Sequence, residues 1–274
     1  MAYIFLPILI VLAISFSEPQ PAGGIKHFGS VKSWQMLWDL GLWKSCLQST
    51  FIAVAASSIA VGIAWLSVLD TRLQASRIRR IILLAVLTPL LVNVVVRALA
   101  FIRIARGGVL FEIFSGLPGV GGYISSFGYS IHSVLWGFVY VYVPYVYLLL
   151  WSEAEEIEEK YLVAARDLGG TPEEIRRRII APSLAAPTRY VWFFLSVTMS
   201  ADFVVPNLFA GGKYVLGGQA IDLLFFQYHN WPASAAMALL LMVGSAAVSW
   251  TLLIVYRIAL ARYRRMRGPK CIAL

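Results

Sequence analysis

The sequence is poor in charge, in cysteine and in histidine, and each shortage excludes a class of protein. Charged residues make up 14% of the 274 residues, against roughly 25% in a soluble domain, so a water-soluble protein with a large core is excluded. Two cysteines far apart in the sequence imply neither a disulfide framework nor a metal site. Three histidines without nearby nucleophiles or metal-ligand spacings indicate no enzyme site. We therefore expect no catalytic residue, metal or cofactor in this chain.

Long apolar runs take the place of the missing charge. The chain is 59% hydrophobic, with a mean hydropathy of +0.76, and runs of about 20 apolar residues predict helices that cross a bilayer. We expect an all-α, polytopic membrane protein of about six spans in a single domain, residues 1–274. The first run is shorter than a span requires, and we treat it as a short or incomplete first span. The predicted spans are 3–16, 46–69, 81–101, 131–151, 190–209 and 233–260.

The basic residues predict the orientation in the membrane. Of the 23 Lys and Arg, 16 fall in the connections around 72–80 and 152–189 and in the C-terminal tail. Because cytoplasmic loops of membrane proteins carry the excess of basic residues, both termini and the 152–189 connection are predicted to be cytoplasmic, in a plasma or inner membrane. The net charge of +9 is thus explained by basic residues that orient the protein in the lipid membrane, and no nucleic-acid partner is expected.

The 152–189 connection, called the coupling segment below, is the most charged part of the chain. Eight of the 14 acidic residues lie between Glu153 and Glu174. The spacing of its apolar residues predicts a helix, and Gly169 with Gly170 is predicted to end that helix, because glycine adopts the left-handed conformation of a helix end without steric cost.

A second, short helix is predicted to begin directly after the glycines. Thr171 is placed to cap it, Pro172 suits its first position, and Glu174 completes a capping box. Pro182 and Pro187 are predicted to break or kink the chain before the fifth span. The segment then has two interpretations: a solvated connector whose arginines anchor the interface, or a docking surface for another protein, with small residues that permit close approach.

The spacing within this segment resembles a family signature. Binding-protein-dependent ABC importer permeases carry E-A-A-x3-G-x9-I-x-L-P on the cytoplasmic side, and Ala164-Ala165, Gly169, Ile179 and Pro182 reproduce that spacing. Val163 stands where the family has glutamate, and alanine replaces the leucine before Pro182. Three further stretches resemble spermidine/putrescine-type permeases: 88–110, 136–150 and 200–221.

The resemblance implies partners and a role for the segment. Two permeases, as a homodimer or heterodimer, would form the pore, two cytoplasmic ABC ATPase subunits would bind below, and an extracytoplasmic binding protein would deliver the solute. ATP and Mg would be bound by the ATPase, so this chain would be a transport subunit rather than an enzyme. Since Val163 removes a charge, Glu159 or Asp167 is hypothesised to replace it. The implied ATPase-coupling residues are Glu159, Val163, Ala164, Ala165, Asp167, Gly169, Ile179 and Pro182.

Polar residues inside the predicted spans are candidates for the translocation path. Asp202 either lines a path or serves a structural role, as an ion pair or a helix cap near Pro206, because an intramembrane carboxylate is costly. Arg97 is expected to snorkel to the interface or to pair with Asp202. Asn93 is expected to face protein, and Tyr140 belongs to a set of aromatic residues that either bind a cation or simply pack.

The leading hypothesis is therefore a permease subunit of an ATP-driven ABC importer for a small polar solute, with a polyamine as the first choice. The alternative is a secondary transporter or channel that works without an ATPase. Such a protein needs no docking segment, and discontinuous membrane helices are expected in it.

Overall fold

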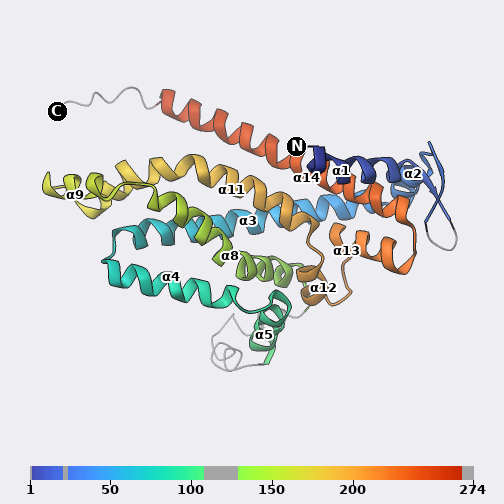
Figure 1. Ribbon diagram of the computed structural model, residues 1–274, viewed down its shortest axis with the longest axis horizontal. Helices are drawn as coiled ribbons and strands as arrows, with labels where there is room; N and C mark the ends of the chain where they lie inside the picture. The colour runs from blue at the N-terminus through green and yellow to red at the C-terminus, as the bar shows by residue number, and fades with distance from the viewer. Residues whose placement is uncertain (1, 21–23, 108–128, 267–274) are drawn as a thin grey trace.

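The computed structural model describes residues 2–20, 24–107 and 129–266, and Figure 1 shows an elongated bundle of helices. Its elements are α1 (Ala2–Ser15), β1 (Ser17–Pro19), β2 (Ile25–Phe28), α2 (Lys32–Asp39), α3 (Leu42–Leu73), α4 (Ser76–Leu90), α5 (Val94–Gly107), α8 (Ile131–Glu155), α9 (Glu159–Asp167), α10 (Pro172–Ile175), the π-helical η1 (Arg176–Ile180), α11 (Ala181–Ala201), α12 (Val204–Ala210), α13 (Gly217–Asp222), the π-helical η2 (Leu223–Gln227) and α14 (Trp231–Met266).

The expected all-α polytopic fold is confirmed. Among the described residues, α3, α8 and α14 are each long and apolar enough to cross a membrane, and two bent helix pairs bring the number of spans to five if each pair is one span. The first apolar helix, α1, has 14 residues, about 21 Å at 1.5 Å per residue, which is less than the roughly 30 Å of hydrocarbon. The antiparallel pair β1–β2 follows it.

The long helix α3 lies at the centre of the bundle and packs against α8, α11 and α14. One face of α3 is a row of alanines without any exposed surface, at positions 53, 56, 60 and 64. Alanines spaced three or four residues apart share one face of a helix, and small side chains let neighbouring membrane helices approach closely. The core thus forms around α3, which contacts these three helices.

Two spans are broken rather than straight. The pair α4 and α5 bends by 98° across residues 91–93, and the pair α11 and α12 bends by 61° across Asp202 and Phe203. The predicted span 81–101 encloses the first break, which hydropathy does not register because residues 91 and 92 are as apolar as their neighbours. The second break precedes Pro206 by four residues and leaves that proline near the start of α12.

The prediction that Pro182 and Pro187 break or kink the chain before the fifth span is wrong as to a break. The helical run is continuous from Pro172 to Ala201. Pro182 falls in the first turn of α11, directly after the π-helical residues of η1, whose wider hydrogen bonding accommodates a change of register; Ala181 N–H, for example, donates to Arg176 O. Pro187 lies inside α11, which continues past it.

Candidate functional site

Within the coupling segment, α9 lies at one end of the bundle, opposite to β1, β2 and α2 (Figure 1). Its C-terminal end is a Schellman motif. Gly169 has a φ of +82°, its N–H donates to Arg166 O at 2.9 Å, and Gly170 N–H donates to Ala165 O at 2.9 Å. These are the two hydrogen bonds that satisfy the last carbonyls of a helix, so the predicted role of the glycine pair is confirmed.

A capping box starts the next helix, as predicted. Glu174 N–H donates to Thr171 Oγ1 at 3.3 Å, and Thr171 N–H donates to Glu174 Oε2 at 3.1 Å. The hydrogen bond from the Thr171 N–H holds the pKa of the Glu174 carboxyl below its usual value. The two caps, each formed by neighbouring residues, set the bend between α9 and α10.

The outward face of α9 is apolar. Tyr161 is 55% exposed and Leu168 is 88% exposed, and both share a helix face with the exposed Ala164. On the opposite side, Leu162 is fully buried and anchors the helix to the core. A single exposed leucine is common on a protein surface, but Leu168 lies at the tip of a capped bend. The outward face of α9 is therefore suited to insertion into a groove of another protein.

The other predicted coupling residues occupy different surroundings. Val163 is 44% exposed, Asp167 is exposed, and Ala165 is half-buried against the core. Ile179 also packs against the core, whereas Pro182 is exposed at the start of α11. The structure therefore exposes Val163, Ala164 and Asp167 on α9, turns Ala165 toward the core, and places Ile179 and Pro182 on the helical run that leads away from the bend.

Arg72, in the last turn of α3, holds α9 in place. Its side chain is 4% exposed. Nε donates to Ala154 O at 3.0 Å, Nη2 to Ile157 O at 2.8 Å, and Nη1 to Glu159 Oε2 at 3.2 Å. The planar guanidinium thus joins the last turn of α8 to the first turn of α9, a fork that lysine has no means to reproduce.

The same turn of α3 also contacts the far limb of the bend. Asp70 forms an ion pair with Arg176 of η1, and Arg166 donates to Leu73 O at 3.5 Å. Residues 70–73 of α3 therefore contact the coupling segment both before and after the glycine bend.

Glu159 is already engaged within the chain. It lies 3.2 Å from Arg72 and 3.7 Å from Arg79, and the hydrogen bond from Arg72 lowers the pKa of its carboxyl. Asp167, the other candidate for the charge missing at Val163, is exposed, and no ion pair engages it within the described residues. Of the two, Asp167 is the carboxylate available to a partner.

The two breaks in the spans are capped by their own side chains. Asn93 Oδ1 accepts a hydrogen bond from Val95 N–H at 2.8 Å at the start of α5. Asp202 Oδ1 accepts from Val204 N–H at 2.7 Å at the start of α12. Short polar side chains stabilise helix starts in this way, so the helix-cap interpretation of Asp202 is borne out by its contacts.

A chain of polar and aromatic side chains runs between the two breaks at the middle of α8. Tyr142 donates to Asp202 Oδ2 at 3.0 Å, the rings of Tyr142 and Tyr145 are 6.1 Å apart, and the Arg97 guanidinium lies 5.6 Å from the Tyr145 ring. Two aromatic rings thus stand between the cation and the carboxylate, and no ion pair joins Arg97 to Asp202 in the part of the chain that the structure describes.

Both expectations for Arg97, snorkelling and pairing with Asp202, are therefore wrong. The side chain is 4% exposed and donates to Pro89 O at 3.0 Å and Val141 O at 3.2 Å. Pro89 O lies at the end of α4 and Val141 O in the middle of α8, and hydropathy indicates neither contact. Tyr140 is partly exposed and stacks on Phe101 with ring centroids 4.5 Å apart, outside this chain of contacts.

Sequence reasoning missed three residues of the coupling site. Arg72 was counted only as an orientation signal, and its role depends on contacts 82 and 85 residues away in sequence. Tyr161 and Leu168 follow helical spacing in the sequence, but spacing alone does not show that their side chains point outward. A leucine directly before a glycine pair, at the tip of a predicted bend, was the signal available for Leu168.

Comparison with known proteins gives relatives over most of the chain. No family model matches. The chain is 25% identical over 242 residues to the spermidine/putrescine transport system permease protein PotB of Escherichia coli (strain K12), covering 88% of each chain. It is 27% identical over 207 residues to the inner membrane ABC transporter permease protein YdcU of the same organism, covering 69% of this chain and 62% of that protein.

A solved structure shares the fold. A chain of a bacterial ABC transporter involved in the import of the acidic polysaccharide alginate matches with a TM-score of 0.53 at 14% identity, covering 97% of this chain and 90% of that one. At this identity the match concerns the fold alone. The family resemblance noted from the sequence is thus confirmed as similarity over most of the chain to ABC transporter permease proteins of the spermidine/putrescine type, and the fold is shared with a chain of an ABC transporter.

Proposed function

We propose that the chain is the transmembrane permease subunit of an ATP-driven ABC importer. In this proposal α9 docks in a groove of a cytoplasmic ATPase, a second permease completes the pore as a homodimer or heterodimer, and an extracytoplasmic binding protein delivers the solute. ATP and Mg belong to the ATPase. The protein is multi-pass in the inner membrane, with both termini in the cytoplasm.

The observation that carries the proposal is the build of the coupling segment. An exposed apolar tip at Leu168 is held by two rigid caps, and the last turn of α3 contacts both limbs of the bend through Arg72 and Asp70. Closure of an ATPase against α9 would therefore displace α3, which packs against three other spans. A solvated connector needs neither the exposed leucine nor these buried contacts.

A polyamine is the proposed solute. The name of the relative PotB, a spermidine/putrescine transport system permease protein, provides the first support. The second support is chemical: Asp202 and the rings of Tyr142 and Tyr145 form an acidic and aromatic surface midway along α8, which suits an ammonium group. Arg97, at the other end of that chain of contacts, would repel the ammonium group. It would thus direct or limit the movement of the polyamine along this surface.

One observation favours the alternative of a transporter or channel without an ATPase: the two broken spans, since discontinuous helices are the common device of secondary transporters. The breaks alone do not separate the candidates. The coupling segment supports the importer, because a protein that works without an ATPase has no need of a docking surface for one.

Uptake by reconstituted protein tests the proposal. Proteoliposomes containing the permease, its partner subunits and its binding protein are expected to accumulate labelled spermidine or putrescine only when ATP is supplied and the ATPase is present. Full uptake with the ATPase omitted would support the alternative. ATP-dependent uptake of another solute, uncompeted by polyamines, would retain the importer and reject the polyamine.

A further inference from the structure

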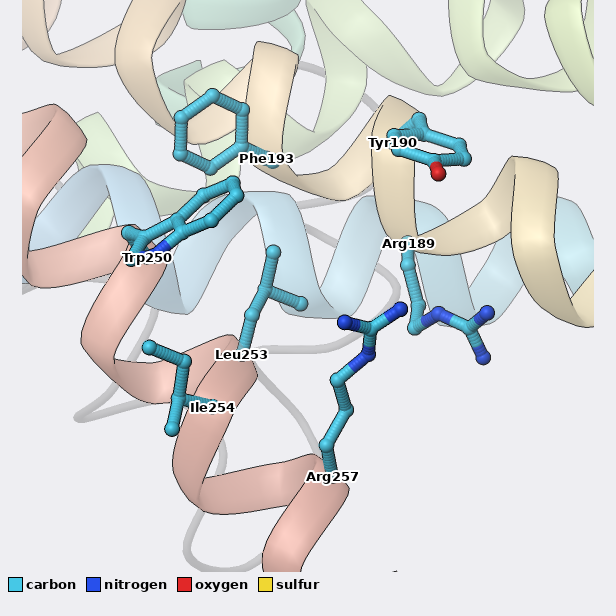
Figure 2. Close-up of a pocket in the computed structure, with 7 residues that line it drawn as sticks. All are labelled: Arg189, Tyr190, Phe193, Trp250, Leu253, Ile254 and Arg257. Atoms are coloured by element: carbon cyan, nitrogen blue, oxygen red, sulfur yellow. The ribbon is translucent and has the colours of Figure 1, made fainter.

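A pocket lies between α11 and α14, toward the end of the bundle where α9 lies (Figures 1 and 2). Each helix contributes one arginine to it, Arg189 from α11 and Arg257 from α14. The remaining wall is aromatic and aliphatic, and Figure 2 shows it extending from the two arginines toward Phe193 and Trp250.

The packing of the two helices places the arginines at one level. Ser196 and Ser249 are both fully buried and hydrogen-bond to each other at 2.8 Å. From this contact Arg189 lies seven residues back along α11 and Arg257 eight residues on along α14, which is about 10–12 Å in both cases. Because the chain runs in opposite directions in the two helices, both arginines lie on the same side of the contact, on the side predicted to be cytoplasmic.

Both arginines lack an anionic partner. Arg176 and Arg178 of the coupling segment are paired with acidic residues, whereas no ion pair or hydrogen bond engages Arg189 or Arg257 within the described residues. Two like charges that share one pocket destabilise each other unless an anion lies between them. The pocket thus has the charge of an anion site and no carboxylate to fill it.

The apolar wall defines the rest of the ligand. Phe193 and Trp250 meet edge to face with centroids 5.9 Å apart, and Tyr190 and Trp250 are 73% and 59% exposed. This surface leads from the arginines toward the middle of the spans, where hydrocarbon surrounds the protein. The pocket itself measures about 110 Å³, well below the roughly 300–1,000 Å³ of sites that enclose a whole small molecule. It therefore suits one polar group of a ligand whose apolar part lies outside.

We propose that this pocket binds an acidic phospholipid of the cytoplasmic leaflet. The phosphate lies between the guanidinium groups of Arg189 and Arg257, and an acyl chain follows the surface of Phe193, Trp250 and Leu253. Basic pockets between spans at the cytoplasmic side are suited to acidic head groups. Since α11 continues from the coupling segment through η1, the lipid would also tie this helix to α14. The site is independent of the solute proposed above.

Native mass spectrometry of the full chain, purified with its partner subunits in detergent, tests the site. Phosphatidylglycerol, phosphatidylcholine and inorganic phosphate serve as the probes. Phosphatidylglycerol is expected to be retained in preference to phosphatidylcholine, and Arg189→Gln or Arg257→Gln to weaken its retention by about fivefold each. Arg262→Gln, an exposed change on α14 beyond the pocket, is the matched control and is expected to have no effect.

A second readout locates the acyl chain. Phosphatidylglycerol with brominated chains is expected to quench the fluorescence of the protein less in Trp250→Phe than in the unaltered chain. Equal retention of the two phospholipids, an equal loss in Arg262→Gln, or displacement of the lipid by millimolar phosphate would overturn the proposal, the last by identifying a small-anion site. Crosslinking of Ile254→Cys to the second permease would do the same, because this surface would then be a subunit interface.

Discussion

Replacing Arg72 by methionine is expected to separate ATP hydrolysis from uptake. A hydrogen bond from a charged donor contributes about 1.5–3 kcal/mol, so the bonds to Ala154 O and Ile157 O together contribute about 3–6 kcal/mol. The contact with Glu159 adds less than about 1 kcal/mol, because that carboxylate is 58% exposed. A loss of about 3 kcal/mol shifts the balance between held and released α9 by about 100-fold. Buried contacts elsewhere keep the bundle folded.

The assay measures uptake and ATP hydrolysis in the same proteoliposomes. Arg72→Met is expected to lower the uptake per ATP hydrolysed by about tenfold or more. Arg72→Lys is expected to lower it less, since lysine keeps the charge and one hydrogen bond but not the several bonds that the planar guanidinium donates at once. Arg77→Met, an exposed change in the first turn of α4, is the control. An unchanged ratio in an assembled Arg72→Met complex would refute the role given to the last turn of α3.

Three further predictions concern Gly170 at the bend, Asp202 at the break between α11 and α12, and the loss of the Glu159 contact in acid. Gly170→Val places a Cβ 2.7 Å from Ala165 O and is expected to lower ATPase binding at least about fivefold, whereas Gly62→Ala, with nothing within 4 Å, is expected to leave it unchanged in a pull-down. Asp202→Asn keeps the cap acceptor and is expected to retain the Tm while slowing polyamine uptake, and equal uptake would show that the charge is dispensable. Because the pKa of Glu159 is lowered in the folded protein, its contribution is present above the unfolded value of roughly 4.3 and is lost as the pH falls through the folded value. The difference in Tm between the unaltered chain and Glu159→Gln is thus expected to be constant from pH 8 to 5 and to vanish in stronger acid.

Local chemistry made the bend predictable. Gly169, Gly170 and Thr171 act on neighbours within five residues, so capping rules alone identify the end of α9 and the start of α10. The apolar runs identify α3, α8 and α14 for the same reason, since bilayer thickness sets a length that a single segment must meet.

The rest depends on contacts between distant segments. Arg72 reads from sequence as one basic residue among several, and only the packing of α3 beside α8 brings its guanidinium to Ala154 O. The break after α4 is not predictable from hydropathy, because Leu91 and Val92 are apolar. The break predicted at Pro182 is absent, because the π-helical turn before it accommodates the proline. Hydropathy and propensity describe each segment alone, whereas these features are set by its neighbours.

Docking of α9 on an ATPase is the central claim, and a crosslinker at Leu168 tests it most directly. Leu168 is 88% exposed at the tip of the bend, and Phe28, 71% exposed at the opposite end of the bundle, serves as the control position. In a complex active in uptake, the photocrosslinker at position 168 is expected to capture an ATPase that carries a P-loop, and the one at position 28 is not. Active uptake with no ATPase captured from position 168, or equal capture from both positions, would contradict the account.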